Sequence, residues 1–327
     1  MATTIPEAKR AWTGKINTVT IGAGSDEGGT RTSVVTVGGA TTLPFYHFEG
    51  ELPHRPVVAM EVWDVPAEEW PEVVKAPFSD VMEDLGAWAR KCVEEHGAEL
   101  LTLRLQGADP GGADKSPEEA AQAAQTVLEA VGVPLIVWGC GTNDKDNEVF
   151  PAVSEVLSGE NCLLGAITED NYKTLTALGT AYGHKLIAES PVDINIAKQV
   201  NILALDAGYP MENLVMYPNT GALGYGIEYV YSIMERSRIA ALQGDKAMAL
   251  PILCDLGLQV WKVKEARASE DELPGWGDLS SRGPMWEAAT AYTYLLAGAD
   301  ILVMRHPEAV RATKSAIERL MGKGGSS

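Results

Sequence analysis

Short apolar runs alternate with helix-like stretches along most of this chain. The runs are almost continuously hydrophobic, which is typical of parallel strands that are buried on both faces. The predicted strands are Val57–Trp63, Leu100–Gln106, Leu135–Trp138, Cys162–Ile167, Lys185–Glu189, Asn213–Tyr217, Leu250–Cys254 and Asp300–Met304. Helices are predicted over Ser79–His96, from Pro117 onward, and over Asn147–Leu157, Glu169–Tyr182, Asp193–Ala207, Ile227–Gln243, Pro284–Ala297 and Pro307–Met321.

Local signals support the ends of these helices. Ser116 precedes Pro117, and Glu119 stands three residues after the serine, which is the pattern of a capping box. Glycine just before the next strand is typical of a helix C-cap, and it occurs at Gly97, Gly132, Gly183, Gly208, Gly244 and Gly298. Repeated strand–helix units predict an α/β fold, a closed (β/α)8 TIM barrel, with an open doubly wound sheet as the alternative.

Residues 1–55 have a different pattern. Ile16–Ile21 and Ser33–Val37 alternate polar and apolar positions on either side of a glycine-rich loop, which predicts a β-ribbon. Leu43–Phe48 is expected to add a third strand. We therefore expect three regions: an N-terminal β-extension over 1–55 that covers the barrel, the barrel over 56–321, and a disordered tail over 322–327.

Composition limits the classes of partner. The 327 residues carry a net charge of −19, with a pI near 4.7. No basic patch is available to neutralise phosphates, so we expect no nucleic-acid partner and no anionic membrane surface. The four cysteines are scattered without ligand spacing, and no apolar run approaches membrane-spanning length. We expect a cytoplasmic protein with reduced thiols, no metal site and no iron–sulfur cluster in this chain.

The ends of the predicted strands carry mostly small, amide and hydroxyl side chains. In a barrel of this kind the working surface lies at these ends. They read Gln106-Gly107, Gly139-Cys140-Gly141, Ile167-Thr168, Glu189-Ser190, Asn219-Thr220-Gly221 and Asp255. With few acids and hardly a histidine, this surface is expected to hold a ligand that brings its own chemistry.

Candidate catalytic groups are few. No nucleophile–base pair, zinc motif or phosphate-binding loop is recognisable. Glu189 and Asp255 are candidate proton carriers at strand ends. His54, His96 and His184 are expected to be exposed turn residues, whereas His306 follows the last strand and is interpreted as a helix cap or a proton carrier, with capping favoured. We therefore assign no catalytic residue.

The segment Trp261–Gly283 is long for a loop at the working end of a barrel. A long loop in this position is typical of a lid or a partner-binding element. Its basic residues, which we expect to face a partner, are Lys262, Lys264, Arg267 and Arg282. The alternative is that Trp261, Trp276 and Trp286 only anchor the loop to the barrel.

Five stretches carry a resemblance to a known family. They are Pro56–Asp64, Leu103–Gly107, Val137–Gly141, Ala188–Asn195 and Asn213–Gly221. On these residues the chain resembles the small subunit of the corrinoid iron–sulfur protein, the delta subunit family of acetyl-CoA decarbonylase/synthase, from about Gly14 to Met321. The resemblance implies a barrel paired with a large subunit that carries the iron–sulfur cluster.

The resemblance also implies a cofactor and a role. A cobamide, a cobalt corrinoid, would lie between the barrel and the large subunit, and would carry methyl groups from methyltetrahydrofolate methyltransferase to acetyl-CoA synthase/CO dehydrogenase. Corrin amides need hydrogen-bond partners, and glycine permits close approach of the main chain. The implied cofactor-binding residues are Gln106, Gly139, Thr142, Asn143, Thr168, Ser190, Asn219, Thr220 and Gly221. Cys140 is expected to point away from cobalt.

Two other barrel functions stay open as alternatives. A pterin-binding methyltetrahydrofolate:corrinoid methyltransferase would typically have Leu-Asp-x-Asn where this chain has Leu101–Arg104, and Asp where it has Tyr217. An aldolase-like barrel would need a Schiff-base lysine at a strand end, and no predicted strand ends in lysine.

Overall fold

The central element is a barrel of parallel strands. The computed structural model describes residues 9–221 and 226–322. Eight strands follow the order β8–β7–β6–β5–β4–β3–β10–β9, with bounds β3 (Val57–Trp63), β4 (Leu100–Arg104), β5 (Leu135–Trp138), β6 (Leu163–Ile167), β7 (Lys185–Ser190), β8 (Leu214–Pro218), β9 (Leu253–Asp255) and β10 (Ile301–Met304). A bridge between Met216 and Ile252 brings β8 to the start of β9. The sheet is a nearly closed barrel, and the predicted TIM-barrel fold is confirmed.

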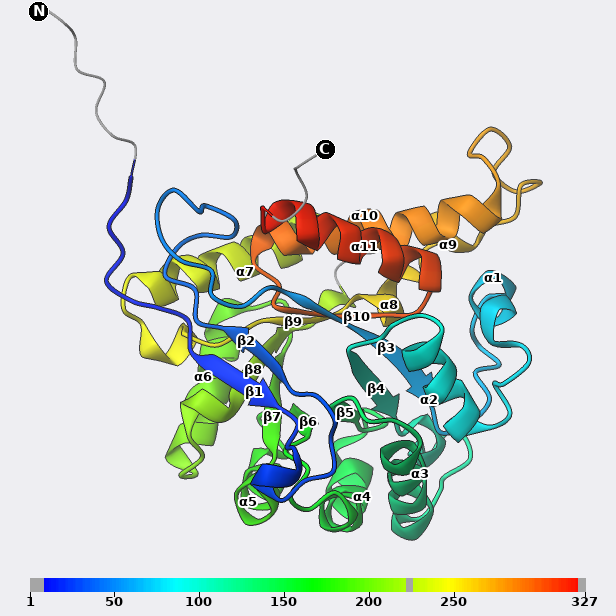
Figure 1. Ribbon diagram of the computed structural model, residues 1–327, viewed down its shortest axis with the longest axis horizontal. Helices are drawn as coiled ribbons and strands as arrows, with labels where there is room; N and C mark the ends of the chain where they lie inside the picture. The colour runs from blue at the N-terminus through cyan, green and yellow to red at the C-terminus, as the bar shows by residue number, and fades with distance from the viewer. Residues whose placement is uncertain (1–8, 222–225, 323–327) are drawn as a thin grey trace, which may run out of the picture.

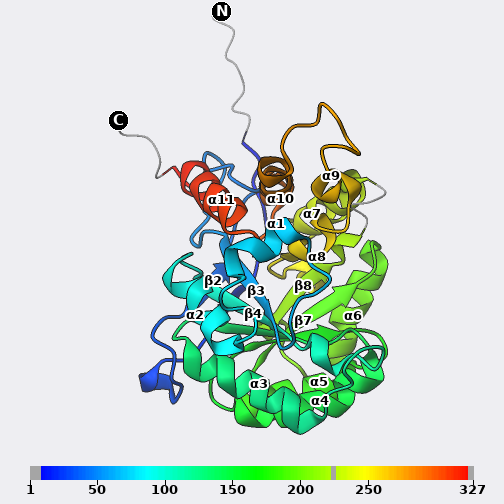
Figure 2. The same cartoon turned by 90° about the vertical axis from the view of Figure 1, so that its right-hand side faces the viewer.

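Helices surround the strands (Figures 1 and 2). Their bounds are α1 (Glu72–Lys75), α2 (Leu85–Glu94), α3 (Pro117–Ala130), α4 (Asn143–Val156), α5 (Tyr172–Tyr182), α6 (Ile194–Asp206), α7 (Ile227–Leu242), α8 (Leu256–Val260), α9 (Lys264–Arg267), α10 (Leu279–Ala297) and α11 (Pro307–Leu320). Figure 2 shows α3, α4 and α5 below the strands and α10 and α11 above them. Within the described ranges, no helix is long and apolar enough to cross a bilayer.

The helix ends follow the sequence signals in most places. The Ser116 hydroxyl accepts a hydrogen bond from the Glu119 N–H at 3.2 Å, and the Glu119 carboxylate accepts one from the Ser116 N–H at 2.8 Å, so the predicted capping box is confirmed. Gly183 ends α5 in the left-handed conformation, as predicted. The prediction for Gly132 is wrong, because Val131 ends α3 in an extended conformation.

Both faces of the barrel strands are buried, as the apolar runs require, except at Lys185 and Glu189 of β7. In β3, Val57 and Ala59 belong to the cluster that fills the barrel interior. Val58 and Met60 alternate with them and pack in the larger cluster between the strands and the helices. Because side chains alternate along a strand, Glu61 continues the inward series at the C-terminal end of β3. A charged residue is thereby placed inside the barrel.

The N-terminal ribbon packs against the barrel interior. It consists of β1 (Thr18–Ile21) and β2 (Val35–Gly38), which pair antiparallel. Val19 and Val37 are buried in the same cluster as the inward side chains of the barrel. The predicted third strand is wrong, because Leu43–Phe48 forms turns rather than a strand.

Histidine positions correct another expectation. His184 is only 1% exposed, and its Nε2 lies 3.2 Å from the Ser154 carbonyl oxygen. The prediction of an exposed turn residue is therefore wrong for His184, because the turn before β7 packs against α4. His54 and His96 are half-buried.

A buried arginine fastens the loop of the ribbon to the barrel. Arg31 Nε donates to the Glu160 carboxylate at 3.0 Å. The same guanidinium donates to the carbonyl oxygens of Leu128 at 2.8 Å and Val131 at 2.5 Å. Because both charged groups are buried, each depends on the other for compensation.

We predict that Arg31→Ala lowers the free energy of unfolding by about 3–5 kcal/mol, because it leaves Glu160 buried without its cation. Urea unfolding followed by circular dichroism measures this change. Arg55→Ala is the matched control: it removes a surface pair with Glu99 and is expected to cost about 0–1 kcal/mol. Equal losses in the two variants would contradict the buried clamp.

Candidate functional site

A layer of charged side chains fills the barrel interior at the C-terminal ends of the strands. Arg104 Nε donates to Glu61 Oε1 at 2.7 Å, and Arg305 Nε donates to Glu61 Oε2 at 3.1 Å. The far end of the Arg104 guanidinium donates to Asp255 on β9. All four residues are buried. This charged layer lies just beneath the strand-end surface and was not predicted from the sequence.

The charges of this layer balance. Burial alone would raise the pKa of Glu61, but Arg305 and Arg104 outweigh it and hold the pKa at about 2. Burial raises the pKa of Asp255, and Arg104 opposes that effect. The sequence did contain a signal for this ion-pair layer. Glu61 and Arg104 interrupt apolar strands, and a buried charge must be paired.

Aromatic rings frame the ion pairs. Trp63 Nε1 donates to Glu61 Oε1 at 2.5 Å. The rings of Trp138 and Tyr217 meet edge to face with centroids 5.1 Å apart, and the Arg104 guanidinium lies 5.0 Å from the Trp138 ring centroid. The charged layer is thus packed on its sides by rigid groups.

Several predicted site residues lie on the rim above this layer. Thr168 Oγ1 and Asn143 Oδ1 are 3.4 Å apart, and Asn143 Nδ2 donates to Asp170 at 3.3 Å. Thr142 is exposed at the start of α4, and its side chain makes no cap hydrogen bond. Gln106 follows β4 and is half-buried. The structure therefore brings Asn143 and Thr168 together, with the open Thr142 beside them.

The ends of β7 and β8 form a second group. Asn219 Nδ2 donates to Glu189 Oε1 at 2.9 Å, and Asn219 Oδ1 accepts from the Gly221 N–H at 2.7 Å. Ser190 and Thr220 lie beneath the surface. The Thr220 hydroxyl donates to the carbonyl at the end of β9 at 2.7 Å. Asn219 is thus the half-exposed amide of this group, while the hydroxyls of Ser190 and Thr220 are below it.

A third group surrounds Asp146 on α4. Its carboxylate accepts from the N–H groups of Cys140 at 2.8 Å and Gly141 at 3.2 Å, and from the Cys140 thiol at 3.3 Å. A Cβ at Gly139 would lie 2.3 Å from this carboxylate, so the glycine there makes room for Asp146. Burial and the charge of Asp146 raise the pKa of Cys140 to about 11. The thiol therefore stays protonated at neutral pH.

Burial also shifts the pKa of Glu189, the acid at the end of β7. It raises the pKa of Glu189, the hydrogen bond from Asn219 lowers it, and the nearby charge of Asp255 raises it again. The net direction is upward. Of the two candidate proton carriers, Glu189 lies half-exposed at the rim, whereas Asp255 is buried in the ion-pair layer.

The long loop after β9 divides into an anchored part and an open part. Trp261 is buried, whereas Trp276 is 49% exposed. Arg282 is buried too and donates to the carbonyl oxygens of Glu265 and Gly277, both at 2.8 Å. Arg282 therefore holds the loop together, and the expectation that it faces a partner is wrong.

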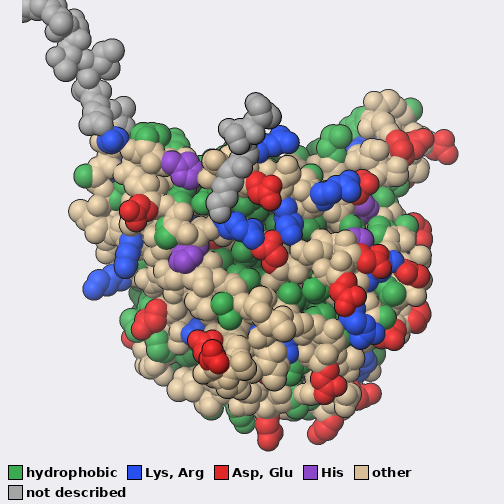
Figure 3. All heavy atoms as spheres, viewed as in Figure 1, with side chains coloured by type: hydrophobic (Ala, Val, Ile, Leu, Met, Phe, Trp, Pro, Cys, Tyr) green, Lys and Arg blue, Asp and Glu red, His purple; other side chains and the backbone are tan. Residues whose placement is uncertain are grey.

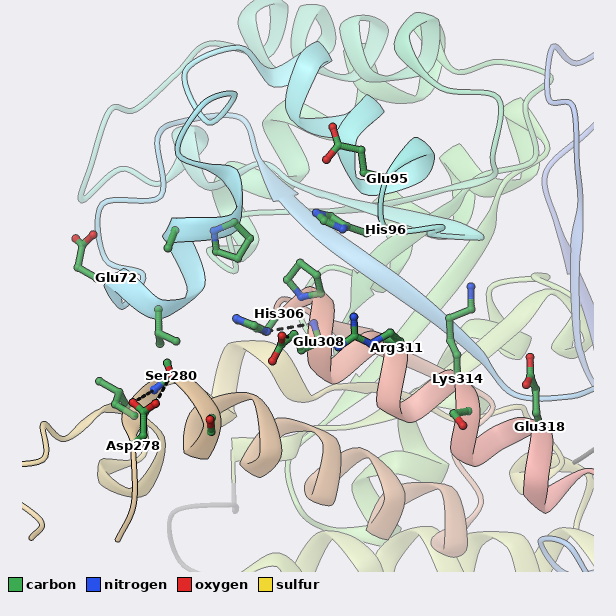
Figure 4. A pocket seen from close by; sticks show the side chains of 17 residues that line it. Glu72, Glu95, His96, Asp278, Ser280, His306, Glu308, Arg311, Lys314 and Glu318 are labelled. Atoms are coloured by element: carbon green, nitrogen blue, oxygen red, sulfur yellow. Dashed lines mark hydrogen bonds and ion pairs between the residues drawn. The ribbon is translucent and has the colours of Figure 1, made fainter. Parts of the chain in front are cut away.

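His306 caps a helix. Its Nδ1 accepts from the Glu308 N–H at 3.2 Å at the start of α11, as Figure 4 shows. Burial lowers the pKa of His306 to about 4. The ring lines a lateral groove of about 1190 Å³ that follows α11. The favoured interpretation of His306 as a cap is confirmed.

Glu287 on α10 supports the same turn. Its carboxylate accepts from the N–H groups of Arg305 at 2.7 Å and His306 at 3.0 Å. Burial raises the pKa of Glu287 to about 7, although these hydrogen bonds oppose the rise. The chain after β10 is therefore held by a carboxyl group that changes charge near neutral pH.

Comparison with known sequences gives one consistent family. The family model described as CO dehydrogenase/acetyl-CoA synthase delta subunit matches residues 18–314. Acetyl-CoA decarbonylase/synthase complex subunit delta of Archaeoglobus fulgidus is 38% identical over 96% of this chain and 70% of its own length. The protein of the same description from Methanothermobacter thermautotrophicus is 40% identical over 92% of this chain and 75% of its own.

Comparison with solved structures supports the fold. A dihydropteroate synthase of Xanthomonas albilineans, solved with 4-aminobenzoic acid, aligns with a TM-score of 0.56 and 16% identity over 84% of this chain and 95% of that one. Dihydropteroate synthase of Thermus thermophilus aligns with a TM-score of 0.52 and 19% identity over 83% and 94%. At this identity the likeness shows a shared barrel fold only.

We predict that Asp146→Asn raises the rate of Cys140 alkylation by iodoacetamide at pH 8 by roughly threefold to tenfold, because removal of the carboxylate charge favours the thiolate. The other three cysteines are buried, so mass spectrometry of the intact protein reports Cys140. Asp144→Asn, an exposed position on the same helix, is the control and should leave the rate unchanged. A slower reaction in Asp146→Asn would contradict this arrangement.

A second prediction concerns pH. The pKa of Glu287 is higher in the folded chain than the ordinary value near 4.5, so its contribution to stability is complete below about pH 4.5 and is lost as pH rises through about 7. Glu287→Gln cannot ionise. Compared with this variant, the wild type should lose about 3 kcal/mol of unfolding free energy between these pH values. The measurement is urea unfolding of both proteins at several pH values. If their unfolding free energies changed by the same amount across that range, the assignment would be contradicted.

Proposed function

Because the chain belongs to the CO dehydrogenase/acetyl-CoA synthase delta subunit family, we propose that it is the small subunit of a heterodimeric corrinoid iron–sulfur methyl carrier. It holds a cobamide at the C-terminal face of its barrel jointly with a large subunit that carries the iron–sulfur cluster. The pair shuttles a methyl group in the cytoplasm from methyltetrahydrofolate methyltransferase to acetyl-CoA synthase/CO dehydrogenase. The small subunit by itself catalyses no reaction.

One observation of the structure carries this proposal. The strand-end face has the charges of Glu61, Arg104, Arg305 and Asp255 paired beneath the surface, while amides and hydroxyls lie at the rim beside Glu189. Asn143, Thr168 and Asn219 are half-buried and Thr142 is exposed. A corrin ring carries peripheral amides, and such groups need neutral donors and acceptors rather than fixed charges.

The same face lacks a free axial ligand for cobalt among the residues the structure describes there. Cys140 is protonated and donates its hydrogen to Asp146. His306 is buried and engaged as a helix cap. When bound, the cobamide would supply cobalt as methyl acceptor and donor. The barrel residues would hold the ring, orient it and keep competing ligands away.

The ion-pair layer gives the face a rigid support. Glu61 is bonded from both sides by Arg104 and Arg305, and Trp63 adds a further hydrogen bond. Neighbouring strands of the barrel are therefore tied to one another directly below the rim. A ligand that rests on this rim meets a surface whose shape is set before it binds.

We predict that Asn219→Ala combined with Thr142→Ala reduces cobamide retention by the heterodimer roughly fivefold to tenfold, because each neutral hydrogen bond contributes about 0.5–1.5 kcal/mol. Retention is read from the corrinoid absorption after gel filtration of the co-expressed pair. Asn213→Ala, at the opposite end of β8, is the matched control and should retain the cofactor. Full retention in the double variant would show that these rim residues do not contribute to cobamide binding.

The anaerobic ultraviolet–visible spectrum separates this function from its alternative. Corrinoid bands of base-off character that appear mainly when the large subunit is co-expressed support a shared site. Binding of methyltetrahydrofolate by the chain alone, with methylation of free cobalt(I) cobamide, would instead make it the pterin-binding methyltransferase.

A further inference from the structure

A separate cavity lies beside the barrel mouth. It has a volume of about 360 Å³ and is formed where the end of β3, the chain before α1, the end of α8 and the turn after β10 meet. Three tryptophans and three basic residues line it, and we call it the tryptophan pocket: Trp63, Trp70, Trp261, Lys262, Arg267 and Arg305. The roles assigned to the rim above leave this pocket unused.

The aromatic walls are preformed. Trp63 and Trp70 meet edge to face with centroids 5.6 Å apart. The Arg305 guanidinium lies 4.5 Å from the Trp70 ring centroid and 5.3 Å from that of Trp63. Trp63, Trp70 and Trp261 are each at most 5% exposed. Their positions are therefore fixed by packing, so a ligand would enter a pocket that already has its shape.

The charges of the pocket do not cancel. Arg305 is compensated by Glu61. Among the described residues, Lys262 and Arg267 form no ion pair, and the one carboxylate in the lining is Glu69. Burial and the positive charges of Arg305 and Arg104 lower the pKa of Lys262. The pocket is therefore a local excess of positive charge.

That excess stands out against the rest of the protein. The whole chain carries a net charge of −19, and in Figure 3 acidic side chains are spread over the face shown, with basic ones between them. Two cations without carboxylate partners are unexpected in such a surface, because acids are abundant enough to pair with them.

We propose that the tryptophan pocket binds a small organic carboxylate. Its apolar body packs against the apolar side chains of the lining, which include Pro71 and Leu258, and its carboxylate lies between Lys262 and Arg267. The buried indole N–H of Trp70 has no hydrogen-bond partner in the described structure. Five of the nine lining residues are apolar, and a concave, largely apolar lining with a few polar groups is the usual form of a small-molecule site.

The test uses the purified chain without cobamide, so its outcome is independent of the cofactor proposal. Isothermal titration calorimetry is carried out with phenylacetate, with its neutral analogue phenylacetamide, and with inorganic phosphate. Lys262→Gln and Arg267→Gln remove the two unpaired cations of the pocket. Lys264→Gln is the matched control, because Lys264 is an exposed lysine of the same loop that lies outside this pocket.

Phenylacetate is expected to bind at least about tenfold more tightly than phenylacetamide or phosphate. Lys262→Gln and Arg267→Gln should each weaken phenylacetate binding several-fold, and Lys264→Gln should change it less than about twofold. Three results would overturn the proposal: no phenylacetate binding, equal binding of acid and amide, or equal losses in Lys264→Gln and Lys262→Gln. Tighter binding of phosphate would also overturn it, by showing a simple anion site in which the tryptophans play no part.

Discussion

The buried carboxylate of Glu61 is the constraint on which the working end of this barrel depends. An ionised group inside a barrel is tolerated only when cations and donors surround it. Arg104, Arg305 and Trp63 meet that need from β4, from the turn after β10 and from β3 itself. Removing any one of them would leave charge without full compensation, so the four side chains act as one unit.

This unit determines what the surface above it can offer. The guanidiniums are engaged by Glu61 and Asp255, and the rim groups are amides, hydroxyls, the Glu189 carboxyl and a thiol that is bonded to Asp146. Such a surface is poor in nucleophiles and bases but well suited to hold a large neutral ring. A protein with this arrangement positions a reactive cofactor and relies on the cofactor for the chemistry.

The sequence predicted the repeating elements well and the tertiary pairings poorly. Strand runs and the Ser116 capping box depend on local composition and spacing, so they could be recognised from the chain alone. Burial of His184 and the fastening role of Arg282 depend on which distant backbone carbonyls lie nearby, and no local pattern records that. Among the predicted site residues, Asn219 lies at the rim, whereas the next residue, Thr220, is buried and donates to the carbonyl oxygen at the end of β9. Neighbouring residues of one turn can thus lie at the surface and in the interior.

The N-terminal ribbon has a consequence for how the chain is made. The Asn17 N–H donates to the Ala249 carbonyl oxygen at 2.7 Å, so the ribbon reaches its final contacts only after synthesis has passed Ala249. Until then the apolar side chains of Val19 and Val37 have no barrel interior to cover. The ribbon strands thus leave the ribosome before the barrel strands but are among the last to be buried, and a nascent chain must keep their apolar side from aggregating in the meantime.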